Sequence, residues 1–110
     1  MRTITHLAVK KFLNGENFSK DNTRVFSQNG LVQMILHGNP IAVRIYNRSI
    51  IIDNCGWFSS TTKERLNGLL YALGRIGIQQ KDFKWYLDGK EWNGKETRLL
   101  PNNQWEYVFP

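Results

Sequence analysis

The sequence predicts an α+β protein, and three observations lead to this class. Residues 61–76 carry leucines on a helical period, which indicates one main amphipathic helix. Residues 23–53 alternate apolar and polar side chains between turn dipeptides, which indicates an antiparallel β-meander of about four strands. Half of the 14 aromatic residues lie in short alternating runs after residue 80, so we expect a Trp-rich C-terminal β-hairpin and an end strand.

The length and composition favour one domain in a reducing compartment. A chain of 110 residues is expected to fold as a single domain, residues 1–110. The one cysteine excludes an internal disulfide framework. No apolar run has the length of a membrane span or a signal peptide, so we expect a cytoplasmic protein without membrane contact.

A short helix is predicted at the N-terminus. Thr3 or Thr5 opens it, and Asn14-Gly15 ends it, because glycine adopts the left-handed conformation common after a helix. Residues 16–22 are expected to be a polar connector.

The clearest hairpin signal is Asn29-Gly30, which stands between the alternating runs 23–28 and 31–36. A tight type I′ turn requires positive φ at both central residues, and this dipeptide allows it. Further strands are expected at residues 41–46 and 49–53, with a turn at Asn47-Arg48 between them.

The alternation assigns the side chains of the meander to two faces. The apolar face is expected to pack under the main helix and comprises Val25, Val32, Met34, Leu36, Ile41, Val43, Ile45, Ile50 and Ile52. The second face mixes basic and aromatic residues and comprises Arg24, Phe26, Gln33, Arg44, Tyr46 and Ile51.

The main helix is expected to begin at Thr61, because Glu64 follows at the spacing of a capping box. Its apolar stripe runs from Leu66 to Ile76, and Gly77 is placed to end it. The helix start, residues 59–63, has hydroxyls and free N–H groups that suit a phosphate-binding site. N-capping of the helix alone also explains these residues.

The charge balance favours a polyanionic partner. The chain has 15 basic and 9 acidic residues, a net charge of +6, and the excess belongs to the first 80 residues. Nucleic acid is the most common polyanion in a cell, although the same charge can serve solubility alone. We expect the basic residues Arg24, Arg44, Lys63 and Arg65 to contact phosphates, with Tyr46 or Phe26 stacking on bases. The alternative is that this face is covered by another element.

The sequence contains no catalytic, metal-binding or cofactor motif, so we expect no enzyme activity, no metal and no cofactor. Cys55 is the one candidate nucleophile, and His6 or His37 would have to be its base. Nothing in the spacing brings either histidine to Cys55, and a lone cysteine at a strand-to-helix turn is usually a small buried residue.

Three short motifs resemble small proteins of bacteriophages and prophages, most of which have no assigned function. They are His37 to Ala42, Asn54 to Trp57 and Thr61 to Asn67, so the resemblance covers roughly residues 30–70. It implies a phage accessory protein acting in the bacterial host cell, in a class rich in host-takeover and counter-defence factors. It assigns no functional residue.

The leading hypothesis is therefore a non-enzymatic phage-type accessory protein that binds nucleic acid or a ribonucleoprotein through the basic and aromatic surface. The alternative is a protein that binds and inhibits a bacterial defence enzyme through its Trp-rich C-terminal region. Trp85, Tyr86 and Trp92 would then form the interface, since aromatic residues dominate binding hot spots.

Overall fold

The computed structural model describes residues 1–46 and 49–109, and the turn predicted at Asn47-Arg48 lies outside them. The α+β class is confirmed. The described chain has two helices, α1 (Thr3–Asn14) and α2 (Ser60–Ala72), and antiparallel strands. The strands are β1 (Phe18–Lys20), β2 (Thr23–Gln28), β3 (Leu31–Leu36), β4 (Asn39–Ile45), β5 (Ser49–Ile52), β6 (Ile78–Lys81), β7 (Lys84–Leu87), β8 (Lys90–Trp92), β9 (Thr97–Leu100) and β10 (Gln104–Tyr107).

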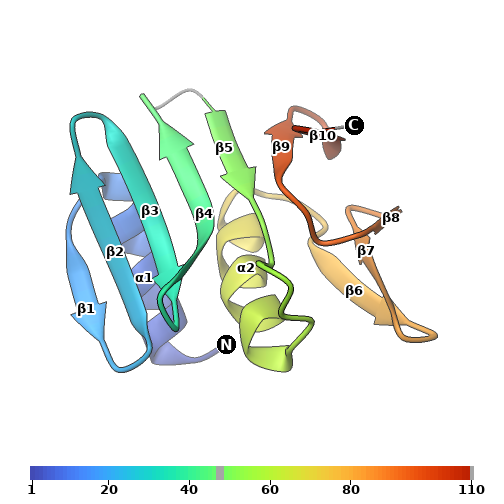
Figure 1. Ribbon diagram of the computed structural model, residues 1–110, viewed down its shortest axis with the longest axis horizontal. Coiled ribbons are helices and arrows are strands. Elements are labelled where there is room, and N and C mark those ends of the chain that lie inside the picture. Colours follow the sequence, from blue (N-terminus) through green and yellow to red (C-terminus); the bar gives the residue numbers. More distant parts are fainter. Residues whose placement is uncertain (47–48, 110) are drawn as a thin grey trace.

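The strands form two sheets (Figure 1). The larger sheet has the order β1-β2-β3-β4-β5-β9-β10, so the last two strands of the chain extend the meander beyond β5. The smaller sheet, β6-β7-β8, comes from the segment between α2 and β9. Helix α2 and the smaller sheet therefore connect two strands that are neighbours in the larger sheet.

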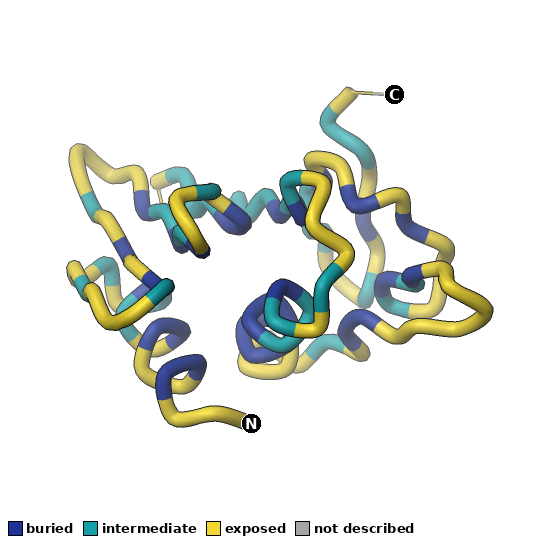
Figure 2. The backbone as a smooth tube through the Cα atoms, turned by 60° about the horizontal axis from the view of Figure 1, so that its bottom comes forward, coloured by how far each residue is buried: buried dark blue, intermediate teal, exposed yellow. Residues whose placement is uncertain are grey.

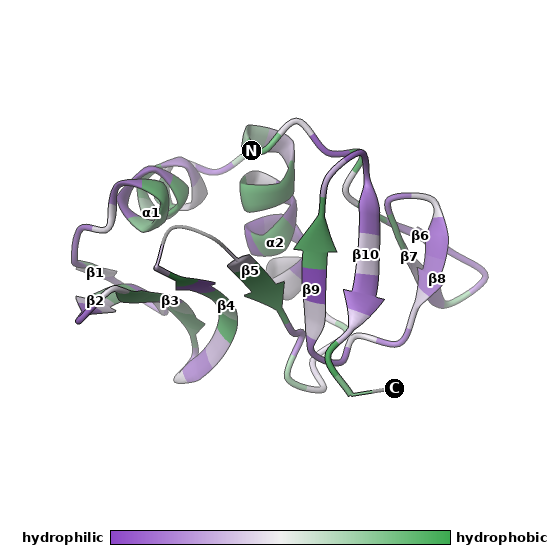
Figure 3. Ribbon diagram, turned by 90° about the horizontal axis from the view of Figure 1, so that it is seen from above, coloured by the Kyte–Doolittle hydropathy of each residue, from purple (hydrophilic) through white to green (hydrophobic). Residues whose placement is uncertain are grey.

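Both helices lie on the same side of β1–β5 (Figure 3). The sides of the helices that face inwards are buried (Figure 2), and buried positions alternate with more accessible ones along β2 and β3. A continuous core of buried side chains joins the helices, the larger sheet and the smaller sheet. No described element covers the opposite face of β1–β5, which we call the open face.

The predicted hairpin and most of the predicted pairing are confirmed. Asn29 and Gly30 both have positive φ, and Gln28 pairs with Leu31. The connector prediction for residues 16–22 is wrong in part, because Phe18–Lys20 forms β1 along the edge of β2. This three-residue strand is too short to give a recognisable alternation.

The face assignment of β4 is wrong, and a β-bulge is the reason. Met34 pairs with Ala42 and Ile35 with Pro40, so Ile41 is an extra residue in β4. Ile41 and Ala42 are consequently both buried. From there on the alternation is reversed, and Arg44, paired with Val32, lies on the helix-covered face instead of the open one.

The main helix was predicted about four residues too long. Its N-cap is Ser59, whose side chain accepts a hydrogen bond from the Thr62 N–H at 3.1 Å, and its last residue is Ala72. Gly74 has positive φ and ends the helix before Gly77 can. Leu73 and Ile76 therefore lie beyond the helix and are exposed.

The C-terminal region contains more strands than predicted. Strand β6 completes a three-stranded sheet with the expected β7–β8 hairpin, and β9 joins β10 to the larger sheet. Trp85 and Trp92 stack with ring centroids 6.1 Å apart, and both are buried. The Trp-rich segment thus builds core. None of the described helices is long and apolar enough to cross a membrane.

Candidate functional site

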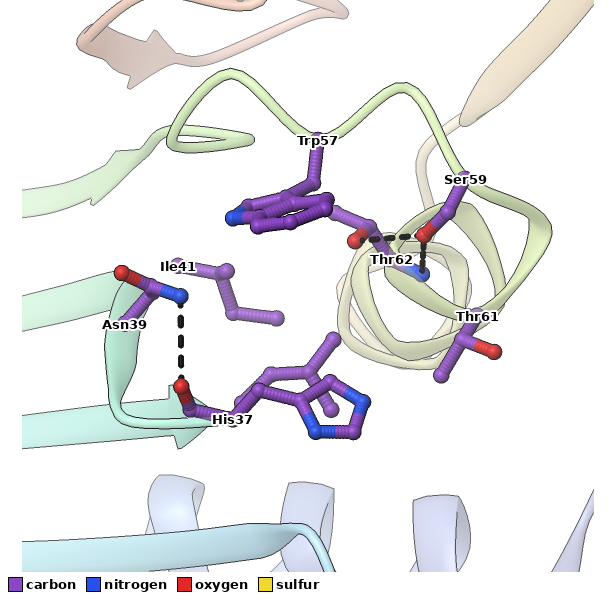
Figure 4. Close-up of a pocket in the computed structure, with 8 residues that line it drawn as sticks. His37, Asn39, Ile41, Trp57, Ser59, Thr61 and Thr62 are labelled. Atoms are coloured by element: carbon purple, nitrogen blue, oxygen red, sulfur yellow. Dashed lines mark hydrogen bonds between the residues drawn. The ribbon is translucent and has the colours of Figure 1, made fainter.

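A pocket of about 500 Å³ lies between the β3–β4 turn and the start of α2 (Figure 4). We call it the Trp57 pocket. Trp57 and His37 lie on opposite sides of it, and the Ile41 side chain lies between them. The pocket is lined by Leu36, His37, Asn39, Ile41, Trp57, Ser59, Thr61 and Thr62.

Local sequence positions the β3–β4 side of the pocket. His37 and Gly38 both have positive φ and form a tight turn, which returns the chain in two residues. The Asn39 side-chain amide donates a hydrogen bond to the His37 carbonyl at 3.3 Å and so braces this turn. The bulge directs Ile41 inwards, where it forms an apolar wall of the pocket.

Asn54 fixes the loop that carries Trp57. Its Oδ1 accepts a hydrogen bond from the Gly56 N–H at 2.8 Å, and its carbonyl accepts one from the Trp57 N–H at 2.9 Å. Its own N–H donates to the Gly94 carbonyl at 2.8 Å. Gly94 packs so closely on the Asn54 amide that a Cβ there would collide with it. The loop is therefore tied to the C-terminal part of the chain.

Trp57 differs from the other three tryptophans in its exposure. It is 61% exposed, whereas Trp85 and Trp92 are each 2% exposed and Trp105 is 6% exposed. Nothing in the local sequence distinguishes Trp57 from the others, because burial depends on contacts formed after folding. Trp57 is therefore not among the binding residues predicted from the sequence.

A second feature is the open face of the larger sheet. Arg24 lies on it, exposed, and no carboxylate of the described residues pairs with it. Phe26, two residues on, points the same way and is 39% exposed. The remaining open-face residues of β3, β4 and β5 are mainly apolar and comprise Leu31, Gln33, Ile35, Val43, Ile45 and Ile51.

Arg65 does not have the surface position that a phosphate contact requires. It is fully buried between α1, α2 and β2. Its guanidinium donates to Thr5 Oγ1 at 2.9 Å and to Thr23 Oγ1 at 3.1 Å, and it also pairs with the Glu64 carboxylate. These partners satisfy a buried charge, so Arg65 is a structural residue.

Three other predicted phosphate or base contacts lie apart from one another. Arg44 donates to the Phe12 carbonyl at 2.9 Å and so binds the C-terminal end of α1, beneath the sheet. Lys63 lies on the first turn of α2, with its ammonium group 3.3 Å from Gln80 Oε1. Tyr46 is exposed at the opposite end of the sheet from Arg24 and packs against Gly30.

The alternative interface is also dispersed. Trp85 and Trp92 are buried, and only Tyr86 of the three proposed residues is partly accessible. Phe58 packs edge-on against Trp85 with ring centroids 5.0 Å apart, which closes that side of the pair. The two tryptophans are therefore not available as exposed anchors.

Residues 1–107 match the family model described as Kyanoviridae Gp96 protein. The chain belongs to this family. The match covers nearly the whole chain and confirms the expected phage origin. Among curated proteins and solved structures, none matches the chain.

The thiol of this phage protein is poorly suited to nucleophilic attack. Burial, with Coulomb repulsion from Asp53 and Glu96, raises the pKa of Cys55 to about 11. Its Sγ donates a hydrogen bond to the Pro40 carbonyl, with 3.3 Å between the two atoms. At neutral pH Cys55 is therefore a neutral thiol, whereas the reactive form is the thiolate. Among the described residues, no group of three His, Cys, Asp or Glu side chains is placed to hold a metal ion.

Proposed function

We propose that this Kyanoviridae Gp96 family member is a non-enzymatic accessory protein that binds nucleic acid or a ribonucleoprotein. It would act in the cytoplasm of the bacterial host, in host takeover or counter-defence. The observation that carries the proposal is the open face, on which the exposed Arg24 stands beside the half-exposed ring of Phe26. The neutral Cys55 thiol and the lack of a catalytic motif support a binding role.

An uncovered sheet face suits single-stranded nucleic acid for two reasons. Guanidinium groups bind phosphate oxygens, and an aromatic ring on the sheet gives a base a flat surface for stacking. The net charge of +6 adds long-range attraction to any nucleic acid. Gln28 and Gln33 flank Phe26 on the same face and supply amide groups for base edges.

A salt titration of binding to short single-stranded DNA and RNA tests this proposal. We expect the affinity to fall as salt rises, and Arg24→Gln to reduce the slope of log K against log salt by about 1. Lys81→Gln is the matched control, since it removes an exposed cation from the smaller sheet. Absence of binding at low salt, or an equal effect of both substitutions, contradicts the proposal.

A second candidate is a protein-binding inhibitor of a bacterial defence enzyme. The apolar side chains on the open face favour it, because exposed apolar patches commonly mark protein interfaces. The contact would then involve Leu31, Val43 and Ile45 in place of the buried tryptophans.

Pull-down from nuclease-treated host lysate separates the two candidates. A partner that is retained after nuclease treatment and lost with Leu31→Glu supports protein binding. Leu31 is 37% exposed, so this substitution changes the surface with little change to the core. A partner that disappears with nuclease supports the nucleic-acid proposal.

A further inference from the structure

We propose that the Trp57 pocket receives one unstacked nucleobase of a single-stranded nucleic acid. This inference rests on the proposed nucleic-acid binding and adds a second site, with Trp57 as the stacking residue. The site has three parts: an exposed ring, an apolar slot beneath it, and polar groups at the rim.

Trp57 is exposed on a loop whose backbone is braced. Leaving a large indole 61% exposed forgoes part of the stabilisation that its burial would give. Yet Asn54 and the missing side chain at Gly94 brace the backbone of this loop, and the Trp57 ring lies over the pocket (Figure 4). An exposed aromatic side chain has only two torsions to fix, so it binds a ligand at low cost in conformational entropy.

The shape of the pocket fits a flat ring. Trp57 and His37 stand on opposite sides with Ile41 between them (Figure 4), and Leu36 adds to the apolar lining. Bases that leave a duplex or come from a single strand are bound by stacking against aromatic and apolar side chains. The volume of about 500 Å³ is large enough for one base with its sugar.

Polar groups at the rim match the edge of a base. Asn39 uses one amide hydrogen on the His37 carbonyl and keeps its other hydrogen and its Oδ1 for a ligand. Among the described residues, only Asn22 lies within hydrogen-bond reach of His37 Nε2, at 3.5 Å, which leaves Nδ1 for a ligand. Ser59 Oγ accepts from the Thr62 N–H and lies 2.9 Å from Thr62 Oγ1, so these two hydroxyls are paired with each other and Asn39 supplies the polar recognition.

The pocket lies at the same end of the sheet as Arg24. Arg24 pairs with Ile35 and Ile35 with Pro40, so these residues form a row that ends beside the β3–β4 turn. Two strand spacings separate Arg24 from Pro40, which is about 10 Å. One nucleic-acid strand held at Arg24 on the open face can therefore pass around the ends of β3 and β4 and place a base in the pocket on the helix-covered side.

Tryptophan fluorescence and NMR test this inference directly. Because the other three tryptophans are buried, fluorescence quenching by a soluble ligand reports mainly on Trp57. The Trp57→Phe variant shows how much of the quenching comes from Trp57. The probes are a short single-stranded oligothymidylate, an abasic oligonucleotide of the same length, and the corresponding duplex. We expect saturable quenching and a shift of the Trp57 indole N–H signal with oligothymidylate alone.

The affinity of variants gives the second readout. Trp57→Ala should weaken oligothymidylate binding by about 5- to 150-fold, the range measured for one base–aromatic stack, and Trp57→Phe should retain part of the affinity. Phe83→Ala, at a 97% exposed ring on the smaller sheet, is the matched control and should change nothing. Equal quenching by the abasic probe, or unchanged affinity of Trp57→Ala, overturns the inference.

The design distinguishes failure of the pocket from failure of the proposed function. Salt-dependent binding that needs Arg24 but leaves the Trp57 signal unchanged overturns the pocket and leaves the function standing. If no oligonucleotide binds, the proposed function fails, and free adenosine then tests the pocket alone. A shift of the Trp57 and His37 signals with adenosine supports the pocket, and unchanged signals overturn it.

Discussion

At the residue scale, several side chains with the chemistry of binding residues are buried and stabilise the fold, whereas Trp57 is exposed to solvent. Arg65 and Trp85 carry the charge and the aromatic surface of good binding residues, but both are buried. Trp57, by contrast, lies in the turn before the main helix and is exposed there. Residue type indicates which chemistry is possible, whereas burial decides where it can act.

The Glu64–Arg65 cluster makes the stability depend on pH. Burial alone would raise the pKa of the Glu64 carboxyl, but hydrogen bonds from Thr5, the Arg2 N–H and Arg65 outweigh it and hold this pKa below its usual value. A lowered folded pKa means that these contacts stabilise the protein fully above the unfolded value of about 4.3. The stabilisation is lost as the pH falls through the lowered folded pKa.

We therefore expect Glu64→Gln to be less stable than the wild type at pH 7, with the difference shrinking below about pH 4. Urea unfolding midpoints measured between neutral and acid pH give both curves. The carboxylate of Glu16 remains in both proteins, so the difference isolates Glu64. Glu91→Gln, at an exposed pair with Lys84, is the control and should give nearly parallel curves. A constant difference between Glu64→Gln and wild type across this range contradicts the assignment.

At the element scale, the sequence predicts what local contacts decide. The end of α1 at Gly15, the Asn29-Gly30 hairpin and its register were all predictable from turn chemistry. The bulge at Ile41 was not, because one extra residue leaves the hydrophobic pattern of β4 almost unchanged while it reverses the later side chains. Arg44 was consequently assigned to the wrong face.

Non-local pairing accounts for most of the remaining differences. Strand β9 pairs with β5 across an intervening helix and a separate sheet, and no local pattern encodes such a partner. The Trp57 pocket also depends on contacts between segments that are far apart in the sequence. It lies between the β3–β4 turn and the start of α2, and in the sequence these two segments look like an ordinary turn and an ordinary helix cap.

Gly68 shows how packing between elements overrides local propensity. Glycine within a helix costs about 1 kcal/mol relative to alanine. A Cβ at Gly68 would, however, collide with Thr5 Cγ2 and lie 3.1 Å from Met1 Sδ and 3.3 Å from Val9 Cγ2. Glycine here lets α1 and α2 pack closely.

We expect Gly68→Ala to destabilise the protein, because overpacking typically costs about 1–3 kcal/mol and exceeds the gain in propensity. Ala72→Gly, at an exposed position of the same helix, reports the propensity alone and should cost up to about 1 kcal/mol. Thermal and urea unfolding measure both. An increase in stability for Gly68→Ala would show that α1 can move aside at little cost.

At the scale of the whole molecule, one ion pair holds the C-terminal half together. Arg75 donates from Nε to Asp88 Oδ2 at 2.8 Å, and it also donates to the carbonyls of Leu100 and Gln104. Asp88 in turn accepts the Gly77 N–H at 2.9 Å. The segment after α2, the turn of the smaller sheet and the β9–β10 hairpin therefore meet at one buried pair, with side chains 10% and 0% exposed.

Asp88→Asn tests whether this pair joins the two sheets. Asparagine tolerates the positive φ of this position and keeps an acceptor for Gly77, but it leaves the Arg75 guanidinium buried without its counter-charge. Breaking a buried pair in this way costs roughly 3–5 kcal/mol, whereas Glu91→Gln, at an exposed pair on the same small sheet, should cost about 0–1 kcal/mol. Urea unfolding measures both, and amide exchange should show faster opening of β6–β10 than of β2–β4. Equal losses for the two variants, or uniform exchange, would show that the C-terminal half is held by its tryptophan core alone.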